Sequence, residues 1–280
     1  MSLMMRGARA RVELRALRMK QTLGGPAIVL ALVLGETAVG GLAVLWLSDA
    51  WGRTRMGFFK LIGAVLASMA VLAWLAARAP LLNGPTTSAA ARAGVALLMS
   101  FAIATVVWQV LLWAGARTAS RIVGIAAVPI GIAALVTIAF DPAGASKPAS
   151  AAFQLLAGAL FAGAVTDGLL LGHWYLVERK LTRAPLARMN TLFLAGCVVA
   201  IAGAILGRHP GTATVQLSPL LGAGALAAYL AVGLAALCVM IGFFIRALVK
   251  EDSIQAATGL FYLAVILALA AEFAAKVRFF

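Results

Sequence analysis

Two acidic residues in this sequence lie within long apolar stretches. Glu36 lies in LALVLGETAVGGLAVLW, and Asp167 lies in ALFAGAVTDGLLLGHWY. A charged side chain at the centre of a bilayer costs several kcal/mol, so an acid in such a segment is a candidate functional residue. Nearby glycines leave space for water or a ligand beside each carboxyl. We therefore predict that Glu36 and Asp167 transfer protons; the alternative is that each acid only holds two helices together.

A second group of polar residues lies near one end of the apolar stretches. Its most distinctive part is the run Gly172-His173-Trp174-Tyr175, a few residues after Asp167. Four further residues are expected at a similar depth: Lys60, Gln109, Asn190 and Gln255. We predict that these side chains line one polar pocket with the two acids at its floor. The alternative for the aromatic residues is an ordinary place in the interfacial aromatic belt.

Several kinds of chemical site are excluded by the sequence. The two histidines, His173 and His209, are expected near opposite ends of helices, roughly 27 Å apart at the helical rise of 1.5 Å per residue. They cannot ligate one haem within one chain. No zinc-protease motif, P-loop or nucleophile elbow is present. The two cysteines, Cys197 and Cys238, lie in apolar stretches and are predicted to be small buried residues.

The composition of the chain defines the elements that must position these residues. Hydrophobic residues make up 64% of the 280 residues and charged residues only 11%, against about 25% charged in a typical soluble protein. A soluble enzyme, a nucleic-acid-binding protein and a secreted disulfide-rich domain are therefore excluded. The sequence predicts an all-α polytopic membrane protein whose partners include membrane lipid.

A bilayer core about 30 Å thick requires about 20 apolar helical residues, and eight stretches meet this requirement. Continuous apolar runs favour helices over the alternating strands of a barrel. The predicted spans are Pro26–Ser48, Gly57–Ala77, Ala93–Gly115, Ile122–Phe140, Ala152–Val177, Met189–Gly207, Pro219–Leu248 and Ser253–Lys276.

The net charge of +14 is interpreted as a topology signal, because almost all basic residues lie between the apolar runs. We call the side of the membrane at which the first span begins the N side, and the opposite side the far side. The basic residues are divided almost equally between the two sides, although the loop from Arg179 to Arg188 favours a cytoplasmic far side. Residues 1–25 are predicted to form a basic N-terminal tail.

The spacing of the two acids suggests an internal repeat. Glu36 and Asp167 are nearly half a chain length apart, and each is followed at the same interval by the start of the next span. The prediction is two four-helix halves, residues 26–140 and 152–276, that enter the membrane from the same side as a parallel repeat. Evenly spaced loops in any eight-span protein are the alternative explanation.

This layout resembles the NrfD/PsrC-type membrane subunits of respiratory oxidoreductases, which are built from two four-helix bundles. The likeness covers the arrangement of spans and, loosely, the first-span sequence LGETAVGG from Leu34 to Gly41. It implies a subunit that binds quinone or quinol without haem and works with a partner carrying the redox centres. His173, Tyr175, Gln109 and Asn190 then act as hydrogen-bond donors, Trp174 forms the aromatic slot, and the two acids carry protons.

Two other classes of function remain open. Intramembrane acids, a repeat and a one-sided cavity are also expected of a proton- or ion-coupled secondary transporter. A structural or assembly subunit would use the same polar residues only for helix–helix contacts. In each case the high Ala and Gly content and compact loops favour a bacterial inner membrane.

Overall fold

The structure is a computed structural model that describes residues 2–51, 56–83, 87–141, 147–178, 181–206 and 223–276. Within these ranges, the side chains of residues 2–25 and 223–225 are not described. All regular structure in this part of the chain is α-helical. The helices are α1 (Ser2–Asp49), α2 (Met56–Leu82), α3 (Ala89–Trp113), α4 (Arg117–Ala139), α5 (Pro148–Val177), α6 (Ala184–Leu206), α7 (Ala223–Lys250) and α8 (Ile254–Lys276).

Within the described residues, eight segments are long and apolar enough to cross a membrane. They correspond one to one with the predicted spans, so the all-α polytopic fold is confirmed. Several helices begin a few residues earlier than predicted, as α4 does at Arg117, because charged residues at a membrane surface can continue a helix. The predicted start of the seventh span at Pro219 lies outside the described residues.

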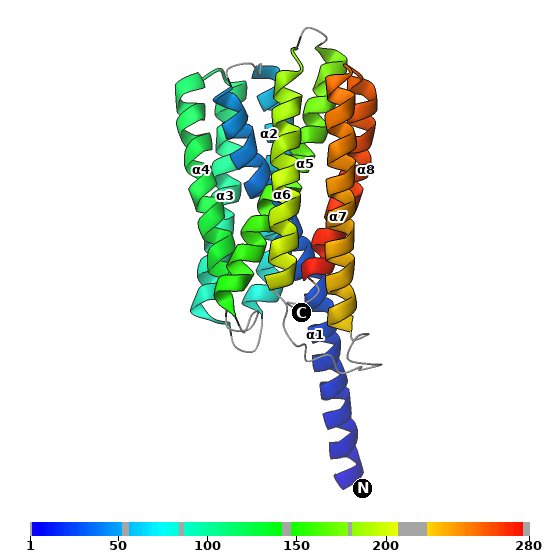
Figure 1. The fold of residues 1–280 in the computed structure, drawn as a ribbon. Helices are drawn as coiled ribbons and strands as arrows, with labels where there is room; N and C mark the ends of the chain where they lie inside the picture. Colours follow the sequence, from blue (N-terminus) through cyan, green and yellow to red (C-terminus); the bar gives the residue numbers. More distant parts are fainter. Residues whose placement is uncertain are drawn as a thin grey trace.

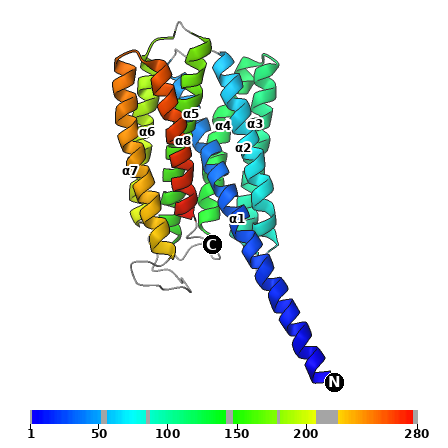
Figure 2. The ribbon, with the colours of Figure 1, turned by 90° about the vertical axis from the view of Figure 1, so that its right-hand side faces the viewer.

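The helices pack as two groups of four. In the first group α1 contacts α2, α2 contacts α3, α3 contacts α4, and α4 contacts α1. In the second group α5, α6, α7 and α8 contact one another in the same cyclic order. Figure 2 shows α3 and α7 at opposite edges of the molecule, with α1, α5 and α8 between them. We call the two groups the first ring (α1–α4) and the second ring (α5–α8).

The two rings meet mainly through α1 and α5, with smaller contacts of α8 on α1 and of α4 on α5. The membrane segments of α1 and α5 are therefore largely buried, whereas the other six helices expose a face to the surroundings. Gly40 and Gly163 allow this close packing. A methyl group on Gly40 would overlap the carbonyl of Ala159, and one on Gly163 would overlap the backbone of Gly40 and Gly41.

Helix α1 continues beyond the membrane segment that begins at Pro26. Its backbone is helical from Ser2, and Figure 1 shows this part extending past the ends of the other helices. The predicted basic tail therefore continues the first span as one helix. The side chains of its basic residues lie outside the described part of the structure.

Candidate functional site

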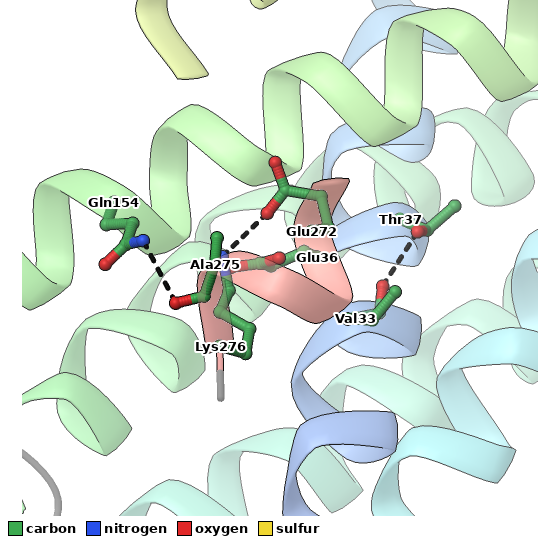
Figure 3. Close-up of polar contacts among 7 residues, drawn as sticks. All are labelled: Val33, Glu36, Thr37, Gln154, Glu272, Ala275 and Lys276. Carbon is green, nitrogen blue, oxygen red and sulfur yellow. Dashed lines mark hydrogen bonds and ion pairs between the residues drawn. The ribbon is translucent and has the colours of Figure 1, made fainter. Parts of the chain in front are cut away.

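The main polar feature of the interior is a cluster of three charged residues, Glu36 on α1 and Glu272 and Lys276 on α8. The Lys276 Nζ lies 2.9 Å from Glu36 Oε1 and 2.7 Å from Glu272 Oε2. Both Glu36 and Lys276 are fully buried, and Glu272 is only 4% exposed. Figure 3 shows the Glu36 side chain directed from α1 towards Lys276. We call these three residues the charged triad.

The spacing of Glu272 and Lys276 follows from the α-helix. Residues four apart lie on the same helix face, so an acid and a base at this spacing can pair along α8. Glu36 reaches the same ammonium from the other ring, across the contact between α1 and α8. The triad thus links the first and second rings by a charge contact.

The triad contains two carboxyl groups and one ammonium group. With all three groups ionised, it carries one unbalanced negative charge in the buried interior of the protein. A buried charge without a partner costs several kcal/mol. One additional proton or one monovalent cation would balance the charge of the cluster.

Gly158 on α5 provides the space that the two carboxyl groups occupy. A methyl group on Gly158 would lie 2.5 Å from Glu272 Oε2 and 2.8 Å from Glu36 Oε2. Both carboxyl groups therefore face the same point on α5. Glu36 Oε2 has no hydrogen-bond partner among the described residues. This oxygen remains an unused acceptor beside the triad.

Gln154, one turn before Gly158 on α5, holds the end of α8. Its Nε2 donates to the carbonyl of Ala275 at 3.4 Å, and its side chain is buried (Figure 3). The last carbonyl groups of a helix have no partner within the helix, so they require partners from elsewhere when they are buried. Gln154 thus helps to position the turn that carries Lys276.

Asp167 lies on α5, nine residues beyond Gly158, which corresponds to about 13 Å along the helix axis. It is fully buried, and neither carboxyl oxygen has a hydrogen-bond partner among the described residues. It faces α1, since a methyl group on Gly41 would lie 3.3 Å from Asp167 Oδ1. Asp167 and the triad therefore lie at two different levels of the same α1–α5 interface.

The depths of the two predicted proton-transfer residues follow from their places on the helices. Glu36 is ten residues from Pro26, where the first membrane segment begins on the N side. Asp167 is ten residues from Val177, where α5 ends on the far side. Each acid is therefore about 15 Å along its helix from one membrane face. The internal repeat predicted from their spacing stays a prediction.

Three of the residues predicted for the far-side pocket lie around the first turn of α2. Trp174 packs on Gly57 and has its ring centroid 6.4 Å from that of Phe58. Gln109 donates to the carbonyl of Phe59 at 3.4 Å. The Lys60 Nζ lies 4.6 Å from the centroid of the Trp113 ring, in a cation–π contact.

The other four predicted pocket residues do not join this group. Asn190 donates to the carbonyl of Gly242 at 2.9 Å, within the second ring. The Tyr175 hydroxyl donates to the carbonyl of Thr182 at 2.5 Å. His173 and Gln255 are exposed on the surface of the bundle. The structure thus distributes the seven residues among separate helix contacts and the surface.

Two indole groups, those of the half-buried Trp46 and the fully buried Trp108, lie beside Gln109 in the first ring. The rings of Trp46 and Trp108 are 5.8 Å apart, and Trp46 also contacts the ring of Phe59 at 5.6 Å. The Nε1 atoms of both tryptophans and the Oε1 atom of Gln109 are buried and have no partner among the described residues. Buried indole N–H groups usually find an acceptor, so this place can accept a water molecule or a carbonyl-bearing ligand.

The sequence pattern does not predict the triad. Lys276 ends the last predicted span, where a basic residue is expected to contact the membrane surface, but its side chain is fully buried. The only signal was the spacing of Glu272 and Lys276, four apart at the end of the last apolar stretch. Their meeting with Glu36 depends on how α8 packs against α1, which the sequence pattern does not specify.

Other sequence predictions have different outcomes. Cys197 and Cys238 are buried and unpaired, as predicted. His209 lies outside the described residues, so the argument against haem remains a prediction. Within the described ranges, no group of three or more metal-ligating side chains is present.

No protein-family model and no curated protein matches the sequence.

Proposed function

We propose that this integral membrane protein transfers protons along the interface between its two rings, as part of proton-coupled transport. The observation that carries the proposal is the charged triad, in which two buried carboxyl groups share one ammonium group. The unbalanced charge favours binding of one proton. A polar cluster that only joined helices would be more stable with equal numbers of acids and bases.

Asp167 supports the proposal as the second station for the proton. Like Glu36, it is fully buried in the α1–α5 interface, and its carboxyl has no protein partner among the described residues. The two carboxyl groups are separated by more than one hydrogen bond, so a proton must pass between them through water molecules. Gly163 packs on the backbone of Gly40 and Gly41, so the water path must pass beside this close contact of α1 with α5.

Proton movement can be measured with purified protein in liposomes that contain a pH-sensitive dye. A potassium gradient with valinomycin drives protons inwards, and the wild-type protein is expected to acidify the lumen faster than protein-free liposomes do. Glu36→Gln and Asp167→Asn should each slow the protein-dependent rate about tenfold or more, since each removes a proton-carrying group.

Thr105→Val is the matched control for these variants. Thr105 is also fully buried, but its hydroxyl donates to the carbonyl of Ala102 within α3, away from the α1–α5 interface. The control should retain the wild-type rate. A wild-type rate equal to that of empty liposomes, or equal rates for all variants, would contradict the proposal.

A second candidate is the quinone-binding membrane subunit of an electron-transfer complex. The specific observation in its favour is the unpartnered group of Trp46, Trp108 and Gln109, which lies beside the first turn of α2 with Lys60 and Trp174 nearby. Two indole donors and an aromatic surface suit the carbonyl group of a quinone. The acids of the ring interface would then carry the protons that accompany quinone reduction.

This candidate is tested by quenching of tryptophan fluorescence with decylubiquinone in detergent. Trp108→Phe and Gln109→Leu should weaken the saturable quenching. Trp74→Phe, which changes a tryptophan stacked on Arg78, should not weaken it. Copurification of an iron–sulfur or haem protein in mild detergent would support the same candidate, whereas non-saturable quenching in every variant would exclude specific binding.

A further inference from the structure

The ammonium group of Lys276 lies where an independent cation could lie. It donates a hydrogen bond to Glu272 Oε2 at 2.7 Å and forms an ion pair with Glu36 Oε1 at 2.9 Å. The two acids come from different rings. The group between them therefore acts as a bridging cation that is attached to the chain only by its side-chain stem.

The surroundings of this ammonium provide more acceptors than it uses. Glu36 Oε2 is buried without a hydrogen-bond partner, and it faces Gly158 beside Glu272 Oε2. The site is therefore not saturated by Lys276. A pair of carboxyl groups that faces one small space from two helices is a chemically suitable site for a small monovalent cation.

Lys276 lies on the last described turn of α8. Gln154 of α5 donates a hydrogen bond to the Ala275 carbonyl on the same turn. In Figure 2 the lower end of the α8 ribbon lies higher in the bundle than the lower end of α7, where α7 begins.

We propose that Glu36 and Glu272 form a binding site for a small monovalent cation and that Lys276 occupies this site as a tethered competitor. The proposal rests on the proposed function and deepens it, because it names the class of ion that the acids accept besides a proton. Removal of the lysine should expose a site that external cations can fill.

The test is chemical rescue of Lys276→Ala in detergent-solubilised protein. In this variant the two buried acids lack their cation, and the substitution creates a space the size of the lost side chain. Ethylammonium chloride at tenfold excess over its dissociation constant is expected to raise the thermal midpoint of the variant by roughly 2–4 °C. The wild-type midpoint should not rise, because Lys276 already fills the site.

Three controls make the result specific. Lys276→Met fills the space with an apolar chain of similar length and should not respond to ethylammonium. Tetramethylammonium chloride at equal concentration is too large for the site and should rescue neither variant. Sodium chloride tests the selectivity of the site. If it does not stabilise Lys276→Ala, the site prefers ammonium ions; if it does, the site accepts monovalent cations in general.

Equal responses of wild type, Lys276→Ala and Lys276→Met would overturn the proposal. If Lys276→Ala does not fold, the double variant Glu36→Gln with Lys276→Ala takes its place, because it retains only the carboxylate of Glu272. The double variant should fold and should bind ethylammonium more weakly than a site with both acids would. A complete lack of response to ethylammonium in the double variant would also overturn the proposal. If ethylammonium stabilises Lys276→Ala but the wild-type protein shows no proton flux, the cation site is supported and the proposed function is contradicted.

Discussion

The polar groups at the junction of the two rings differ from those inside either ring. At the junction they are ionisable: Glu36, Asp167, Glu272 and Lys276 all lie at the contacts of α1, α5 and α8. Inside a ring they are mainly neutral amides, as with Gln109 in the first ring and Asn190 in the second. The exception is the buried Asp141 at one end of the first ring, which accepts a hydrogen bond from the Ser88 hydroxyl. Neutral amides suffice to join neighbouring helices. The concentration of charge at the junction therefore requires another explanation, which proton or cation binding provides.

The largest expected effect is the loss of the ammonium group at the junction. Lys276→Met leaves Glu36 and Glu272 facing each other and should destabilise the protein by about 3–5 kcal/mol, the usual cost of removing one partner of a buried ion pair. The change is measured as a fall in the thermal midpoint in detergent. Combining it with Glu36→Gln should recover part of the loss, and no recovery would mean that charge is not the cause.

The second largest loss of stability is expected where the two rings pack together without charged groups. Gly40→Ala adds a methyl group that overlaps the carbonyl of Ala159, and overpacking of this kind costs about 1–3 kcal/mol. Gly233→Ala, where nothing lies within 4 Å of the added methyl group, is the control and should leave the midpoint unchanged. Equal midpoints for the two variants would show that α1 and α5 are not closely packed.

A smaller effect is expected for a neutral amide inside the second ring. Asn190→Leu removes the hydrogen bond to the Gly242 carbonyl and should cost about 1–2 kcal/mol. Proton flux should remain at the wild-type rate, because Asn190 is not part of the junction. A strong loss of flux without loss of stability would weaken the distinction between the rings and their junction.

The smallest effect on stability is expected for Asp167→Asn. Its carboxyl has no partner among the described residues, so the amide loses no protein contact and the free energy of unfolding should change by less than about 1 kcal/mol. Proton flux should nevertheless fall strongly. The combination of unchanged stability and lost flux separates a transferring residue from one that holds helices together.

The sequence predicts the fold better than it predicts the site. Apolar runs of sufficient length define all eight spans, because each helix must satisfy its own backbone hydrogen bonds in lipid. The burial of Glu36 and Asp167 follows from the same argument. The partners of Glu36 cannot be predicted in this way. Glu272 and Lys276 lie at the end of a span and resemble ordinary interfacial charges until α8 is placed against α1.

The pocket predicted on the far side shows the same limit. Position along a span gives the depth of Gln109, Asn190 and Gln255 but not the direction in which each side chain points. Gln109 and Asn190 turn inwards within different rings, whereas Gln255 is exposed. Residues at one depth converge only if each helix is rotated about its axis so that they face the same point. This rotation depends on packing between helices whose faces are nearly all apolar.

The direction of α8 has an electrostatic consequence of its own. Aligned peptide dipoles give the carboxyl end of a helix a partial negative charge of about half an elementary charge. Glu272 and Lys276 are buried on the last described turn of α8, so they lie towards the negative end of this dipole. The field of the helix backbone therefore favours positive over negative charge at the triad, and no single side-chain substitution can remove that preference.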